Sequence, residues 1–123
     1  MIASHHRNTI LLDTNIAILL VIGRASEDYI SRHPTIKSDF NRNDFAELER
    51  FLVQFEAIDV TPHILAEVNS LIRQRVSGNM LYIIMEAFRE FLECANEVAI
   101  ASTDGSLNDA FVWAGLTDAV IAE

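Results

Sequence analysis

The stretch TILLDTN, residues 9–15, places three consecutive apolar residues directly before one acidic and two polar residues. An apolar run without polar alternation is typical of a strand that is buried on both faces, as in a parallel sheet covered by helices. A second apolar run, Ile16 to Ile22, follows at once. We therefore predict a buried strand at residues 10–12 and a short helix at 15–22 that ends at Gly23, because glycine is common at helix ends.

Asp13 is the first candidate functional residue, because it comes directly after the predicted strand. In open α/β sheets, ligands bind in the crevice beyond the carboxyl ends of the strands. A carboxylate beside a buried strand is costly to desolvate unless a positive or donating group meets it. The simpler interpretation is that Asp13 only caps the helix, since Asp does this well. Thr14 and Asn15 are able to cap as well, which would leave Asp13 free for another role.

Length and composition indicate one domain with a substantial core. The chain has 123 residues, half of them hydrophobic, and its mean hydropathy is +0.21, which argues against a disordered acidic chain. No apolar run approaches the roughly 20 residues that a membrane span needs, and the first eight residues contain no signal-peptide core. Cys94 is the single cysteine, so no intrachain disulfide can form and a reducing, cytoplasmic compartment is expected. We interpret His5 and His6 as part of a frayed terminus rather than a metal site.

The net charge of −9 argues against broad phosphate neutralisation, for which a basic face is expected. The charge is also uneven along the chain. From Glu86 onward, eight carboxylates stand against Arg89 alone, whereas residues 1–85 contain ten carboxylates and eight basic residues. Any phosphate contacts must therefore come from the first two thirds of the chain, and the acidic end is expected to meet a cation or a basic partner.

Further helices and strands are predicted to alternate along the chain. Residues 23–43 are the least regular part, which we interpret as a surface connection with some role in contacting a polyanion; Tyr29–Ile30 indicates a partial helix that Pro34 breaks. The next helix is predicted to open at Asp44, with Glu47 as its capping-box partner. The predicted bounds are a helix at 44–55, a strand at 57–60, a helix from 61–62 to about 76, a helix at 80–95, a strand at 98–100, a helix at 107–114 and a helix start at 117.

This alternation predicts an α/β domain with a parallel sheet. Two further acidic residues are candidates within it. Glu67 falls beside Leu71 on the margin of its helix's apolar stripe, where it faces a crevice more naturally than bulk water, although a surface glutamate is the simpler interpretation. Asp118 follows the capping residue Thr117 in the first turn of the last helix, a placement that the helix dipole alone would favour. The sequence contains no glycine-rich phosphate loop, Cys/His metal cluster or serine elbow.

Three motifs occur in order along nearly the whole chain: LLDTN at 11–15, TPHILAEV at 61–68 and GLTDAVIA at 115–122. Together they resemble the motifs of the PIN-domain family of metal-dependent nucleases. The resemblance implies a three-layer α/β/α sandwich with a central parallel sheet. It also implies that Asp13, Glu67 and Asp118 converge on a divalent cation, and that Thr14 or Asn15 supports the first of these acids.

Two features depart from the pattern of that family. The family normally continues past its third acid to a further strand and often a fourth acid, which this sequence lacks. We therefore interpret residues 1–123 as a single PIN-like domain that is truncated or incomplete at its C-terminal end. Asp104 or Asp109 could supply a fourth ligand, although we predict neither. Residues 23–43 are also long for the link between the first two helices, as expected of a subfamily-specific rim.

The residue types suit the chemistry that this resemblance implies. Hard carboxylate oxygens favour Mg²⁺ or Mn²⁺ over zinc, and such a cation activates water and polarises a phosphodiester. We therefore predict a Mg²⁺- or Mn²⁺-dependent endoribonuclease that acts on RNA. The resemblance implies the toxin of a toxin–antitoxin pair, a homodimer held silent by a small antitoxin protein. Surplus apolar residues on the helices at 15–22 and 44–55 are the candidates for a dimer face.

Two alternative classes are also considered. The first is a catalytically incomplete PIN-like interaction module without nuclease activity, which the missing C-terminal end and the charge of −9 would fit. The second is a flavodoxin-like or receiver-type domain, which has an early acidic site but for which we find no matching lysine at a strand end and no phosphate loop. Metal-dependent stabilisation and RNA cleavage would separate the nuclease from the interaction module.

Overall fold

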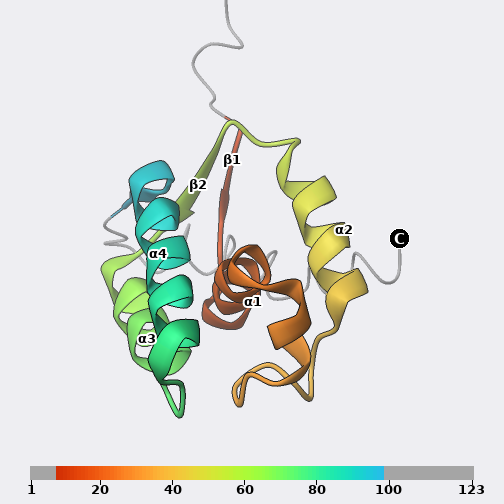
Figure 1. Cartoon of the computed structure of the whole chain (residues 1–123). Helices are drawn as coiled ribbons and strands as arrows, with labels where there is room; N and C mark the ends of the chain where they lie inside the picture. The colour runs from red at the N-terminus through yellow and green to blue at the C-terminus, as the bar shows by residue number, and fades with distance from the viewer. Residues whose placement is uncertain (1–7, 99–123) are drawn as a thin grey trace, which may run out of the picture.

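The computed structural model describes residues 8–98, in which short strands alternate with helices. Figure 1 shows α1 in the middle of the helices, with α2 on one side and α3 and α4 on the other. None of the helices in residues 8–98 is long and apolar enough to cross a membrane. The element order is β1 (Thr9–Leu11), α1 (Thr14–Ala25), the 3₁₀ helix η2 (Glu27–Ser31), α2 (Arg42–Leu52), β2 (Ala57–Val60), α3 (Pro62–Ile72), α4 (Gly78–Cys94) and β3 (Asn96–Glu97).

The three strands form one parallel sheet in the order β1-β2-β3. Leu11 pairs with Asp59, and Asp59 pairs in turn with Asn96. The Leu12 N–H donates to the Asp59 carbonyl over 3.1 Å, which extends the pairing one residue past β1. Since the strands are parallel, their carboxyl ends meet at one edge of the sheet, where α1 and α3 begin. The predicted α/β class with a parallel sheet is confirmed for these residues.

The helix α1 forms the centre of the hydrophobic core. Every residue from Ile16 to Gly23 is buried, because α2, α3, α4 and η2 all contact this helix. A helix that is apolar on every side is stable only when it is surrounded in this way. Each fully buried large aliphatic side chain contributes roughly 1.5–3 kcal/mol, so the same run that predicted the helix also accounts for much of the packing energy.

The prediction that this helix ends at Gly23 is wrong. The helix continues to Ala25, and Gly23 lies inside it against the ring of Phe45 from α2. A Cβ atom at position 23 would collide with that ring. The glycine therefore permits a close approach of two helices, and the end of α1 comes later, where the Ser26 N–H donates to the Ile22 carbonyl over 2.8 Å.

The predicted opening of the second helix at Asp44 is also wrong. The helix α2 begins at Arg42 with Asn41 as its N-cap. Asn41 Oδ1 accepts from the Asp44 N–H, and Asp44 Oδ2 accepts from the Asn41 N–H, each over 2.9 Å. Asp44 is thus the inner member of a capping box, the role predicted for Glu47. Asn caps as well as Asp does, and here the earlier of two good capping residues starts the helix.

Other predicted bounds differ by a few residues. The helix α2 ends at 52 rather than 55, and α3 ends at 72 rather than 76, ahead of a turn in which Arg75 has a φ of 59°. The last described strand, β3, comes just before the predicted strand at 98–100. The strand at 57–60 and the cap of Thr61 with Pro62 are confirmed, and the predicted helix at 80–95 is α4. The elements predicted after residue 98 lie outside the described residues.

The connection between α1 and α2 is more than a surface link. Ile30, His33 and Ile36 are all 0% exposed. The Nε2 atom of His33 lies 3.0 Å from the carbonyl of Ile72 at the end of α3, and its Nδ1 accepts the Thr35 N–H over 3.2 Å. The interpretation as a surface connection is therefore corrected: this segment contributes one side of the core, and its predicted partial helix is η2.

Candidate functional site

Two of the predicted site residues lie at the carboxyl ends of neighbouring strands. After β1 ends at Leu11, the chain enters α1 at Asp13, and after β2 ends at Val60, it enters α3 at Pro62. Because β1 and β2 are parallel and paired, the N-terminal ends of the two helices lie at the same edge of the sheet. In open α/β sheets this edge is where ligands bind.

Asp13 is the N-cap of α1 and is exposed to solvent. Its Oδ1 atom accepts the Thr14 N–H over 2.6 Å. The expectation that Thr14 and Asn15 would cap in its place is wrong, because both lie inside the helix. Within residues 8–98, however, Oδ2 of Asp13 makes no hydrogen bond, so the cap occupies one carboxylate oxygen and leaves the other for a ligand.

Glu67 reaches the start of α1 through Thr14. The Thr14 hydroxyl donates to Oε1 of Glu67 over 2.6 Å, although the two residues are 53 positions apart in the sequence. Thr14 thus donates to both acids, with its backbone N–H to Asp13 and its side chain to Glu67. Hydrogen bonds to ionised carboxylates are stronger than those between neutral groups. Of the two residues expected to support the first acid, Thr14 has this geometry and Asn15 is exposed.

His63 is a neighbour of this pair that the sequence analysis missed. Its Nε2 lies 3.7 Å from Oε2 of Glu67, one turn along α3, and its side chain is 81% exposed. The four-residue spacing on one helix is the signal that would have identified it. Thr61 supports this end of α3, because its hydroxyl oxygen accepts the Ile64 N–H over 3.1 Å. We call Asp13, Thr14, His63 and Glu67 the edge cluster.

The third predicted ligand, Asp118, lies outside the described residues, as do Asp104 and Asp109. Among residues 8–98, no group of three or more His, Cys, Asp or Glu side chains is arranged to hold a metal ion. Two carboxylates joined to one threonine are nevertheless hard oxygen donors of the kind that Mg²⁺ and Mn²⁺ prefer. By donor type, Asp13 and Glu67 would suit two ligand positions of a divalent cation, and residues 8–98 place no third acidic, His or Cys ligand where the three could hold it together.

Two basic residues of the segment at 23–43, which was expected to contact a polyanion, are paired with acids. Arg24 binds Glu49 through two hydrogen bonds of 2.9 Å, which join α1 to α2. Arg42 lies 3.1 Å from Asp28 and 3.6 Å from Glu27. The hydrogen bonds that Arg24 donates to Glu49 raise the pKa of Arg24 above its ordinary value; burial opposes this rise and the charge of Glu49 adds to it. Phosphate contact from this segment would have to come from its other basic side chains.

No family model matches this chain, and no match was found among curated proteins or solved structures. The likeness of three motifs to the PIN-domain family therefore stays a prediction from the residues. Two of those motifs meet in space, since Asp13 and Glu67 both bond to Thr14. The third motif lies outside residues 8–98.

Proposed function

We propose that this chain is a divalent-metal-dependent endoribonuclease with a PIN-like, three-layer α/β/α fold. The observation that carries the proposal is the bridge by Thr14, which holds Asp13 and Glu67 at the ligand-binding edge of a parallel sheet. Acids from two distant parts of a chain repel each other unless donors or cations compensate them. Their arrangement around one shared donor supports a cation site better than two unrelated roles.

In this proposal, Asp13, Glu67 and Asp118 hold one Mg²⁺ or Mn²⁺ ion. When bound, the cation activates water and stabilises charge on a phosphodiester. Thr14 orients the first two carboxylates, since it donates a hydrogen bond to each. His63 stands on the solvent side of Glu67, where its ring is available to contact a substrate phosphate.

The proposed substrate is RNA, and the proposed biological role is that of a cytoplasmic toxin that pairs with a small antitoxin protein as a homodimer. The three sequence motifs support these finer statements. One candidate dimer face is removed, because the apolar residues 16–22 of α1 are buried within the chain. The region around α2 is still a candidate dimer face, since Val53, directly after this helix, is 81% exposed.

Thermal melts with and without millimolar Mn²⁺ would test the proposal, using Asp13→Asn and Glu67→Gln. Asn caps a helix about as well as Asp, so Asp13→Asn removes the charge and keeps the cap. Gln retains an oxygen that can accept from Thr14. We expect Mn²⁺ to raise the melting temperature of the wild type by mass action, and each variant to lose this shift. Asp39→Asn, an exposed carboxylate in the turn before α2, is the matched control and should keep it.

Cleavage of a labelled single-stranded RNA in Mn²⁺ completes the test. The wild type and Asp39→Asn should cleave it, and Asp13→Asn should not. Absence of both a metal-dependent shift and cleavage in the wild type would overturn the nuclease proposal. It would favour the alternative, a catalytically incomplete interaction module, for which the net charge of −9 is the supporting observation.

A further inference from the structure

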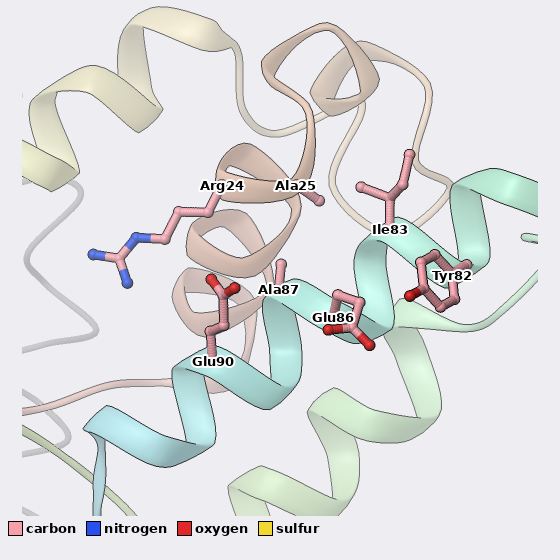
Figure 2. A pocket seen from close by; sticks show the side chains of 7 residues that line it. All are labelled: Arg24, Ala25, Tyr82, Ile83, Glu86, Ala87 and Glu90. Atoms are coloured by element: carbon pink, nitrogen blue, oxygen red, sulfur yellow. The ribbon is translucent and has the colours of Figure 1, made fainter.

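A shallow pocket of about 240 Å³ lies between the end of α1 and the outer face of α4. Arg24 and Ala25 form its wall on α1, and Figure 2 shows Tyr82 and Glu90 at opposite ends of its wall on α4. The pocket is at the other end of α1 from Asp13, roughly 18 Å away along a 12-residue helix. It is therefore separate from the edge cluster.

The pocket combines a small apolar floor with an exposed aromatic ring. Ala25 and Ala87 contribute methyl groups, which leave room for a side chain from outside. Tyr82 is 65% exposed, so most of its ring is open to solvent. An open tyrosine ring attracts a cation over its face, and arginine is the cation found there most often.

The charges at the pocket favour a cation as its occupant. The guanidinium of Arg24 is held by Glu49 and is directed away from the Tyr82 end in Figure 2. Glu86 accepts from Arg89 over 2.7 Å with one oxygen. Glu90 makes no hydrogen bond or ion pair within residues 8–98, although its charge is among the smaller causes that raise the pKa of Arg24 and Arg89. The lining of the pocket itself holds one arginine, Arg24, and two carboxylates, Glu86 and Glu90, which gives a local charge of −1.

We propose that this pocket binds an arginine side chain presented by a protein partner. The aliphatic stem would cover Ala25 and Ala87, and the planar guanidinium would lie against Tyr82 and donate to Glu86, whereas Glu90 lies at the opposite end of the pocket. Arginine fits better than lysine because its planar fork matches carboxylates and stacks on aromatic rings. Nucleic acid fits less well, since its phosphates would meet the carboxylates of Glu86 and Glu90. This inference does not depend on the nuclease proposal.

The test is an NMR titration of the ¹⁵N-labelled chain with N-acetyl-arginine-N-methylamide. We expect saturable shifts of backbone amides along residues 82–90, and weaker binding of the corresponding lysine and leucine compounds. Tyr82→Ala and Glu86→Gln should each weaken arginine binding roughly threefold, as expected for exposed cation–π and ion-pair contacts. Glu93→Gln removes the same charge from the same helix outside the pocket, and it should bind arginine as the wild type does.

Three results would overturn the proposal. The first is an absence of saturable shifts at residues 82–90 up to high millimolar arginine compound. The second is equal binding of the arginine and lysine compounds, or equal weakening by Glu86→Gln and Glu93→Gln, because either would indicate only general attraction to an acidic surface. The third is displacement of the arginine compound by a short oligouridylate through shifts of the same amides, which would identify the surface as one for RNA.

Discussion

Mild acid should destabilise this protein through His33. The imidazole is 0% exposed, and both of its nitrogens are bonded in the neutral form, with Nε2–H donating to the Ile72 carbonyl and Nδ1 accepting from Thr35. The ring of Tyr29 packs against it edge-on, with the centroids 6.0 Å apart. A proton on Nδ1 would therefore abolish one hydrogen bond and bury a charge for which residues 8–98 provide no counterion.

The pKa shift sets the sign of the effect. Burial lowers the pKa of His33 below its ordinary value of 6.5, and the hydrogen bond to the Ile72 carbonyl opposes this only in part. Below about pH 6.5, the unfolded chain binds a proton at this residue that the folded chain does not, so stability falls as the pH falls towards the lowered pKa. The slope is at most about 1.4 kcal/mol per pH unit, and the loss between pH 7 and pH 5.5 is at most about 1.3 kcal/mol.

Urea denaturation of the wild type and His33→Gln at pH 7, 6.5, 6 and 5.5 would measure this loss. Gln keeps a donor near the position of Nε2 and does not titrate, so this variant should be less stable at pH 7 but lose less stability on acidification. The matched control is His63→Gln, because His63 is 81% exposed; it should follow the pH dependence of the wild type.

Parallel pH profiles for the wild type and His33→Gln would refute this reasoning. So would an NMR titration in which the His33 imidazole of the folded protein protonates at pH 6.5 or above. Either result would mean that the folded state accommodates the charged ring, in contradiction to its burial between η2 and the end of α3.

Three further predictions concern stability and can be checked by urea denaturation at pH 7. Gly23→Ala should destabilise the fold by about 1–2 kcal/mol, since overpacking against Phe45 outweighs the helix propensity gained; an unchanged or raised stability would show that the two helices simply move apart. Asn41→Ala should lose about 1 kcal/mol with the cap of α2, whereas Asn43→Ala in the same first turn should change little. Arg24→Gln should lose no more than about 1 kcal/mol, because its bridge to Glu49 is partly exposed; this loss should shrink in 1 M salt, and a loss that salt leaves unchanged would contradict an ionic cause.

The sheet and its class could be predicted because their signals are local. Consecutive apolar residues at 10–12 indicated a buried strand, and the pair Thr61–Pro62 indicated a helix start. Both patterns depend only on residues that are adjacent in the sequence. The long amphipathic helix α4 was predictable within two residues for the same reason.

The wrong predictions concern residues whose role depends on contacts with distant parts of the chain. Glycine is common at helix ends, but Gly23 lies inside α1, where a Cβ atom would collide with the ring of Phe45 from α2. The burial of His33 depends on the Ile72 carbonyl, 39 residues further along the chain. No local pattern in residues 23–43 contains that partner, so an irregular polar segment was interpreted as surface.

The candidate site shows that two interpretations of one residue need not exclude each other. From the sequence, Asp13 was either a helix cap or a ligand, and Glu67 either a surface glutamate or a site residue. In the structure each carboxylate accepts one hydrogen bond from Thr14. The bond to Asp13 belongs to the cap of α1, and the bond to Glu67 joins α1 to α3. The energy of folding therefore positions both acids without a cation. Asp13→Asn with Glu67→Gln separates this structural role from the proposed ligand role, since these changes retain the structural bonds and remove only the charges.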